Sequence, residues 1–173
     1  MLNGLEAGQH VLTLRVDNRL YVDVGINAHS VSDHTQSNWN GIVGSIKLSA
    51  KPTYYIQSMQ IYPETKTKCA QVKIKWAGGN HETETPELFL QAETLSGQSV
   101  GTPVRLQLEA GQTSGEATAT VELGKQAQLW SEHTPNVYRM VASLRSSGGV
   151  DKVSANFGLR EFKANGTRFE VNG

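Results

Sequence analysis

Two carboxylates, Glu82 and Glu84, stand at a spacing that could support acid–base chemistry. Such a pair works when its surroundings keep one carboxyl protonated and leave the other ionised. Here both residues lie between the turn sequence Gly78-Gly79-Asn80 and Pro86, where a polar connection is expected. No neighbouring apolar segment offers a pocket for either carboxyl. We therefore interpret both residues as part of a solvated loop.

A second group of chemically capable residues closes the polar stretch 25–40: Asp33, His34, Asn38, Trp39 and Asn40. An indole ring can stack on the face of a pyranose, and amides and carboxylates can bind its hydroxyls. We name Asp33, Asn38, Trp39 and Asn40 as candidate substrate-binding residues, with Asp33 as a possible metal or sugar-hydroxyl ligand. The alternative, which the pattern favours, is structural: Trp39 packs where two β-domains meet, and the amides bind loop backbone.

No catalytic residue, metal ligand set or cofactor motif is predicted. His29 and His34 lie five apart on a loop without a third ligand, so we interpret them as polar loop residues. The single cysteine, Cys69, excludes an internal disulfide framework and a multi-cysteine zinc site. Because no His–Asn pattern supports a nucleophile, we expect Cys69 to be a small core residue beside a strand.

The elements that would position these residues are β-strands, because apolar and polar residues alternate along most of the chain. In one segment Val72, Ile74 and Trp76 alternate with lysines, as in a strand with one buried and one wet face. Short strands between glycine-rich turns predict an all-β sandwich. The predicted strands are His10–Val16, Gly41–Leu48, Tyr55–Tyr62, Ala70–Trp76, Glu87–Thr94, Thr102–Leu108, Ala117–Leu123, Val137–Leu144 and Val150–Leu159.

Turn sequences and composition suggest where the domains divide. Asn165-Gly166 between two short apolar runs predicts a tight hairpin. The composition changes at Ala50-Lys51-Pro52, and the first fifty residues supply about three strands, too few for an independent core. The chain stops at Asn172-Gly173, a second hairpin-type dipeptide with no returning strand. We therefore expect an interior part of a longer protein.

The charge balance excludes several classes of partner. The chain has 173 residues, with 16 Lys+Arg and 16 Asp+Glu, so its formal net charge is zero. Nucleic-acid binding normally needs an excess of clustered basic residues, so it is not expected. No apolar run approaches the ~20 residues of a membrane-spanning helix. We expect a soluble chain without a nucleic-acid or membrane partner, and the sequence leaves its compartment open.

Three segments resemble glycoside hydrolase family 2, which contains β-galactosidases, β-glucuronidases and β-mannosidases. The segment 8–18, ending in Val16-Asp17-Asn18, is similar to a strand of the family's N-terminal sugar-binding-like jelly roll. The segment 33–48 resembles the "Trp-x-Gly-Ile" block that closes that domain. The segments 129–138, 157–162 and 169–173 are similar to the "Leu-Trp-Ser", "Phe-Gly-x-Arg" and "Phe-x-Leu-Asn-Gly" motifs of its immunoglobulin-like second domain. Val137 and Leu159 are modest departures.

The resemblance implies a division into residues 1–50, the C-terminal part of a truncated jelly roll, and residues 51–173, an immunoglobulin-like β-sandwich. In the family, the sandwich leads into a (β/α)₈ barrel that holds both catalytic glutamates. Such a barrel needs roughly 250 residues, and none of it is present. Retaining glycosidases need two carboxyl groups ~5–5.5 Å apart. We therefore expect a catalytically silent fragment, with Arg160 as a structural partner for a carboxylate or carbonyls at the barrel junction.

Two functional hypotheses follow. In the first, the chain is a scaffold between jelly roll and barrel, and the missing barrel and the rest of the jelly roll are its partners in cis. The whole enzyme would hydrolyse terminal β-glycosides with retention, in the manner of a β-galactosidase. In the second, the chain is an immunoglobulin-like carbohydrate-binding or adhesion module with no hydrolase attached. The sequence beyond Gly173 would distinguish them.

Overall fold

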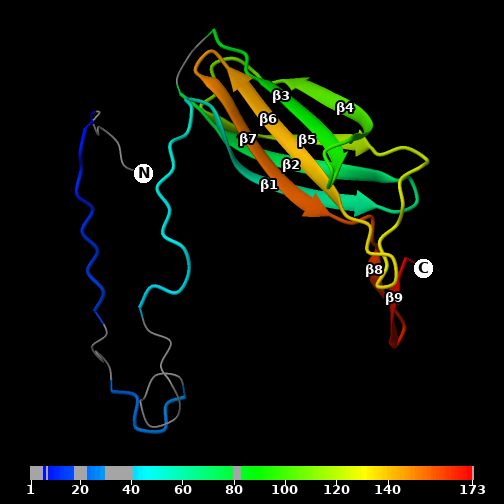
Figure 1. Cartoon of the computed structure of the whole chain (residues 1–173), viewed down its shortest axis with the longest axis horizontal. Coiled ribbons are helices and arrows are strands. Elements are labelled where there is room, and N and C mark those ends of the chain that lie inside the picture. Colours follow the sequence, from blue (N-terminus) through cyan, green and yellow to red (C-terminus); the bar gives the residue numbers. More distant parts are fainter. Residues whose placement is uncertain (1–5, 7, 18–22, 30–40, 80–82, 173) are drawn as a thin grey trace. The chain divides into compact units, whose positions relative to one another are not determined.

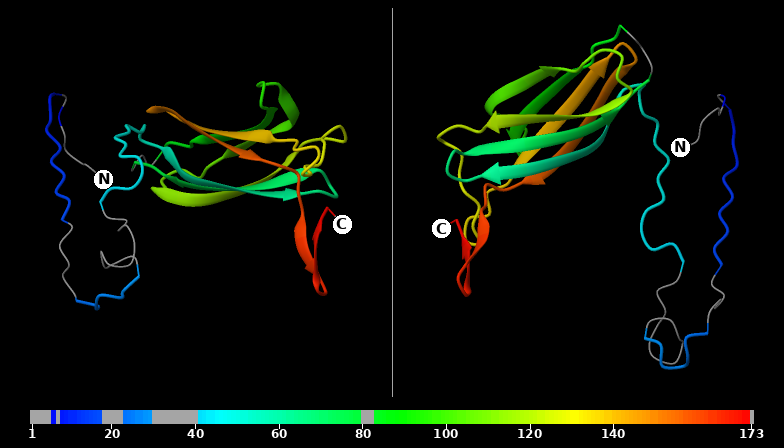
Figure 2. Two further views of the ribbon diagram at one scale, coloured as in Figure 1. Left: turned by 60° about the horizontal axis from the view of Figure 1, so that its bottom comes forward. Right: turned by 180° about the vertical axis from the view of Figure 1, so that it is seen from behind.

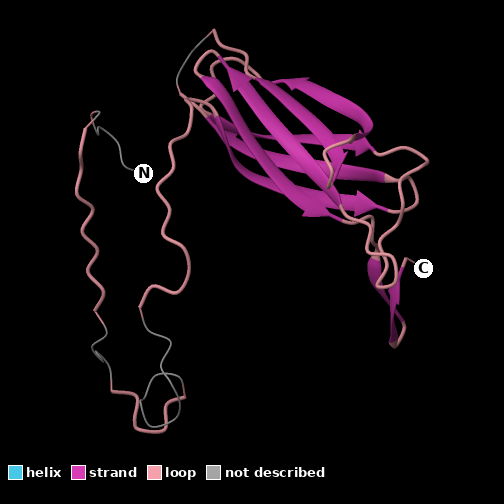
Figure 3. Cartoon of the chain, in the orientation of Figure 1, coloured by secondary structure: helices cyan, strands magenta, loops and turns pink. Residues whose placement is uncertain are grey.

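The structure, a computed structural model, describes residues 6, 8–17, 23–29, 41–79 and 83–172. The chain divides into two units, Met1–Ser49 and Ala50–Gly173. Within the described residues all strands belong to the second unit, and no helix is present (Figure 3). The predicted all-β class is confirmed. Across the same residues, no helix has the length and apolar character to span a membrane.

The first sheet of the second unit has three antiparallel strands in the order β1-β2-β5. They are β1 (Tyr55–Glu64), β2 (Cys69–Ala77) and β5 (Ser114–Glu122). Along β2, Val72, Ile74 and Trp76 are buried, whereas Lys73 and Lys75 are exposed. The lysine and apolar alternation therefore separates a wet face from a core face, as predicted.

The second sheet has four antiparallel strands in the order β4-β3-β6-β7. They are β3 (Glu87–Thr94), β4 (Ser99–Gln107), β6 (Tyr138–Ser146) and β7 (Gly149–Phe157). Pro103 lies within β4, which is compatible with its position at the edge of the sheet. The two sheets form facing layers (Figures 1 and 2), and their inner faces supply the core, including Trp76, Leu90, Met140 and Leu144.

The C-terminal residues form a separate two-stranded sheet. It consists of β8 (Phe162–Asn165) and β9 (Arg168–Val171), and it extends away from the sandwich (Figure 2). The predicted hairpin is confirmed, but its turn is displaced by one residue. Asn165 pairs with Arg168, so the loop residues are Gly166 and Thr167, and Gly166 has a φ of 59°.

The strands predicted in the first unit are not found. The described residues of His10–Val16 and Gly41–Leu48 form no strand, and apolar side chains such as Val11 and Leu48 are 89% and 84% exposed. The reason is physical: alternation favours an extended backbone, but a strand also needs a neighbour that accepts and donates its backbone hydrogen bonds. No such neighbour is present within the described part of this unit.

Candidate functional site

The candidate substrate-binding residues Asp33, Asn38, Trp39 and Asn40 lie outside the described residues, as do His34 and Glu82. Their assignment stays a prediction. Among the residues that the structure does describe, no group of three His, Cys, Asp or Glu side chains is placed to hold a metal ion.

Glu84 has a structural role. Its Oε1 accepts a hydrogen bond from the backbone N–H of Ser147, in the turn between β6 and β7. This contact joins the loop before β3 to that turn, 63 residues further along the chain. The carboxylate therefore stabilises a connection between loops, and the interpretation of this segment as a loop fits the structure.

Cys69 was expected in the core, and this expectation is wrong in part. It is the first residue of β2, beside a strand as predicted, but it is only half-buried. Its Sγ lies 3.4 Å from the carbonyl oxygen of Thr67. Its side chain falls on the outward parity of β2, opposite the row that contains Val72 and Ile74, which explains why it remains outside the core.

Motifs far apart in the sequence converge in a C-terminal cluster, defined here as Trp130, Leu159, Arg160, Glu161 and Asn172. The backbone N–H of Trp130 donates to the carbonyl of Leu159 at 2.9 Å. The Asn172 amide donates to the carbonyl of Trp130 at 2.7 Å and accepts from the N–H of Glu161 at 3.0 Å. One side chain thus joins the segments before β6 and after β7 to the end of the hairpin.

Side-chain packing completes this cluster. The Arg160 guanidinium carbon lies 4.7 Å from the centre of the Trp130 ring, a cation–π geometry. Arg160 was predicted to be a structural partner for a carboxylate or carbonyls at the barrel junction, and this stays a prediction. Within the described residues its guanidinium packs on the Trp130 ring. At Gly158 a Cβ atom would lie 2.9 Å from the Trp130 Cβ, so the indole requires a glycine there.

Beside the C-terminal cluster lies a cleft of about 540 Å³. Its lining residues are Ile61, Pro63, Trp130, Val137, Asn156, Phe157, Gly158 and Arg160. Arg160 is the one charged residue among them, and no carboxylate, imidazole or thiol lines the cleft. The described walls of this cleft therefore lack the pair of carboxyl groups that retaining glycosidases use.

A second hollow, of about 430 Å³, contains two carboxylates, Glu64 and Glu161, together with Cys69. Glu161 Oε2 is 3.3 Å from Lys163 Nζ. Glu64 is exposed at the end of β1. This hollow is therefore an open surface feature, in which one carboxylate is paired with a lysine and the other faces solvent.

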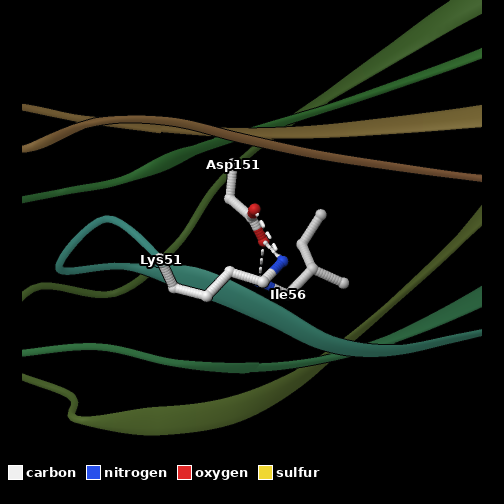
Figure 4. A network of polar contacts seen from close by, with 3 residues as sticks. All are labelled: Lys51, Ile56 and Asp151. Atoms are coloured by element: carbon white, nitrogen blue, oxygen red, sulfur yellow. Dashed lines mark hydrogen bonds and ion pairs between the residues drawn. The ribbon is translucent and has the colours of Figure 1, made fainter. Parts of the chain in front are cut away.

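The segment before β1 is fixed by a buried aspartate, in what we call the linker clamp: Lys51, Ile56 and Asp151 (Figure 4). Asp151 is 6% exposed. Its carboxylate oxygens accept from Lys51 Nζ at 2.8 and 3.0 Å, and Oδ2 also accepts from the Ile56 N–H at 2.8 Å. The clamp thus ties the segment leading into β1 to the first residues of β7.

Two glycines allow this segment to lie close to the sandwich. A Cβ at Gly78 would be 2.1 Å from the Tyr54 ring, and a Cβ at Gly148 would be 2.8 Å from Thr53 Oγ1. Tyr54 is buried against Trp76, with ring centroids 6.1 Å apart. The segment 51–56 therefore has one defined path into β1.

Sequence reasoning missed the linker clamp, although a signal was present. Asp151 occupies an inward position of β7, in the same row as Val153 and Phe157. A carboxylate at a core position predicts a buried partner, because an unpaired buried charge is costly. The pattern does not reveal that the partner is Lys51, 100 residues away.

The fold and these sites define a class: an immunoglobulin-like β-sandwich module in which side-chain contacts hold the segments at both ends of β7. The family model described as "Glycosyl hydrolases family 2" matches residues 54–160, more than half of the chain. The chain belongs to this family, as the sequence motifs predicted. A search of the curated proteins gave no match.

Solved structures share the fold. A family 2 member from Bacteroides cellulosilyticus DSM 14838 matches 70% of this chain at 18% identity, with a TM-score of 0.52. A β-galacturonidase from Eisenbergiella tayi matches 70% at 17% identity and a TM-score of 0.55, and a Parabacteroides merdae β-glucuronidase matches 70% at 14% and 0.51. The chain covers 18%, 21% and 15% of these three proteins, respectively.

Proposed function

We propose that this chain is a non-catalytic scaffold of a retaining glycoside hydrolase. Residues 51–173 form the spacer, and residues 1–50 form the C-terminal part of a jelly roll whose other strands cover their apolar side chains. The catalytic barrel follows the sandwich and carries both catalytic glutamates. We call the whole protein the parent enzyme, and propose that it removes terminal β-linked sugars.

The observation that carries this proposal is that side-chain contacts hold the segment entering the sandwich and the segment leaving it at opposite ends of one strand, β7. The linker clamp holds the start of β7, and the C-terminal cluster follows the end of β7 (Figure 1). A nine-residue strand spans roughly 30 Å. A spacer fixed at both ends holds its flanking segments at one separation, which is the property needed to position a sugar-binding domain beside an active site.

The hairpin supports the same role. Register places Phe162, Ala164, Phe169 and Val171 on one face, and the two phenyl rings stack with centroids 5.4 Å apart. Phe162 and Phe169 are 61% and 75% exposed. Because an isolated two-stranded hairpin is marginally stable in water, its apolar face is suited to packing against a following domain. We propose that this domain is the barrel.

The parent enzyme tests the proposal. We expect it to hydrolyse a chromogenic β-galactoside, with β-glucuronides and β-mannosides as the other members of the panel. The anomeric configuration of the first product, followed by NMR, should be retained. No turnover of any of the three would contradict a glycosidase. A parent sequence that ends, or continues into another sandwich, would favour the carbohydrate-binding module instead.

The proposed substrate contacts are tested separately. If Asp33, Asn38, Trp39 and Asn40 reach the sugar, Asp33→Ala in the parent enzyme should raise KM by about tenfold while kcat changes less, because a ground-state hydrogen bond is lost. Asp23→Ala, which removes a carboxylate that accepts from the Gly25 N–H, is the control. An unchanged KM for Asp33→Ala would dispose of this role.

A further inference from the structure

The outer face of the second sheet carries a concentration of positive charge. Strand alternation places Leu88, Leu90, Met140 and Leu144 in the core, so the intervening residues of β3 and β6 point outward. The outward cations are Arg105 on β4, Arg139 and Arg145 on β6, and Lys152 on β7; we call them the basic face. The outward anions of β3 are Glu87 and Glu93.

Strand register arranges this face in rows. Phe89 lies opposite Arg105 on one side and Ser143 on the other, and Ser143 lies opposite Lys152. One row therefore crosses all four strands, with a cation at each edge and a phenyl ring and a hydroxyl between them. Glu87 and Arg145 are opposite each other in the adjacent row.

Cations outnumber anions on this face by four to two, and each glutamate lies opposite an arginine of β6 in the strand register. Arg105 Nη1 lies 3.5 Å from Glu87 Oε1. Arg139, Arg145 and Lys152 make no ion pair with any residue that the structure describes. The first sheet differs in its balance of outward charges, which are three glutamates and two lysines: Glu64, Glu116, Glu122, Lys73 and Lys75. The two outer faces of one electrically neutral chain therefore differ in their available charge.

A hollow of about 290 Å³ lies on the basic face, lined by Glu87, Phe89, Arg105, Ser143, Arg145 and Val150. The Arg105 guanidinium carbon is 5.3 Å from the centre of the Phe89 ring. A guanidinium binds a carboxylate through two parallel hydrogen bonds. The ring offers an apolar surface and Ser143 a hydroxyl, which suits a ligand that has carboxylates and a carbon skeleton rather than a small inorganic anion.

We propose that the basic face binds an acidic oligosaccharide, with a uronate carboxylate on Arg145 and Arg105 and its pyranose ring against Phe89. The spread of cations across four strands fits an extended chain of repeated negative charges. The choice of a sugar over another polyanion rests on the proposed function. This surface holds a polymeric ligand and takes no part in bond cleavage.

The test uses the 173-residue chain and isothermal titration calorimetry with an oligogalacturonate of five residues. We expect binding that weakens as salt is raised, and no heat from a neutral galactose oligomer of equal length. Arg105→Ala/Arg145→Ala should weaken binding by about tenfold or more, since each charge-assisted contact is lost. The matched control Lys73→Ala/Lys75→Ala removes the same charge from the other sheet and should bind like the unmodified chain.

Equal weakening in both double variants would overturn the site, because binding would then follow net charge alone. Equally tight binding of an oligoglutamate of the same length would overturn the assignment to a sugar, and no binding would overturn the proposal altogether. Unchanged circular dichroism and Tm show that each variant is folded. If the parent enzyme hydrolyses no glycoside but the chain still binds the oligogalacturonate, the proposed hydrolase function is contradicted and the proposed binding surface is not.

Discussion

The two units of the chain contain the same kind of alternating apolar residues but place them in different surroundings. Leu48 of the first unit is 84% exposed, whereas Ile74 of the second is 1% exposed. Ile74 is buried because β2 pairs with β1 on one side and β5 on the other, and the second sheet covers its inner face. Burial therefore depends on neighbouring strands more than on the pattern within one segment.

The comparison assigns different roles to the units. The second has its own core, built from residues of both sheets. The first presents apolar side chains on an extended backbone without a strand in its described residues. The described residues of the first unit therefore lack the neighbouring strands that bury the apolar residues of the second.

Separating the two units should give the largest difference in folding between two parts of the chain. A peptide of residues 1–49 should show no cooperative thermal transition. Residues 50–173 should retain a β-sheet circular dichroism spectrum and a Tm within about 3 °C of the whole chain, since a loss below 1 kcal/mol shifts Tm by only a few degrees. A folded peptide of residues 1–49, or an unfolded chain of residues 50–173, would contradict the expectation that only the second unit folds by itself.

Removing the carboxylate of the linker clamp should have the next largest effect on the stability of the chain. Asp151→Ala leaves the Ile56 N–H without its acceptor and Lys51 without its counter-ion. We expect a loss of about 2–3 kcal/mol in unfolding free energy, discounted because Lys51 is 37% exposed. Urea denaturation measures it.

Glu116→Ala is the control for the clamp variant, because it removes an exposed ion-paired carboxylate and should lower the unfolding free energy much less than Asp151→Ala does. Equal losses in the two variants would show that the buried position of Asp151 contributes nothing.

Glycine-to-alanine substitutions compare how closely the backbone is packed in the two units, through their effect on thermal stability. Gly78→Ala places a Cβ 2.1 Å from the ring of buried Tyr54 and should destabilise the chain by about 1–3 kcal/mol. Gly8→Ala in the first unit meets nothing within 4 Å and should leave Tm unchanged. Differential scanning calorimetry compares the two. A neutral Gly78→Ala would show that the segment 51–56 is not held where the structure places it.

The smallest expected effect is on the pKa of a surface carboxylate and on the pH dependence of stability. The hydrogen bond and charge of Lys75 lower the pKa of Glu116 below its ordinary value of 4.5. A lowered carboxyl pKa stabilises the fold above the unfolded pKa, and this contribution is lost as pH falls through the folded pKa. Lys75→Ala should raise the Glu116 pKa toward 4.5 in an NMR titration, and the stability difference between the chains should shrink at low pH. An unchanged pKa would contradict the pairing.

Local pattern was sufficient for the strands of the sandwich. Alternation predicted β2 and β3 closely because their neighbours in space are strands of the same kind. The start of β4 was placed too late, at Thr102 instead of Ser99, because Gly101 and Pro103 interrupt its apolar pattern. The linker clamp and the Trp130–Arg160 stacking depend on residues brought together by the fold, which periodicity cannot specify.

The family motifs supplied the information about distant contacts that periodicity lacks. They record residues such as Trp130 and Asn172, which are 42 positions apart in sequence and joined by a hydrogen bond. The candidate residues Asp33, Asn38, Trp39 and Asn40 lie outside the described part of the chain, so their role depends on the parent enzyme.

The most direct test of the scaffold is an assay of the purified 173-residue chain beside an equal molar amount of the parent enzyme, using the same chromogenic β-glycosides. We expect turnover by the parent enzyme and none by the chain, because the described clefts hold no pair of carboxyl groups suited to hydrolysis. Hydrolysis by the chain, free of contaminating glycosidase, would contradict it.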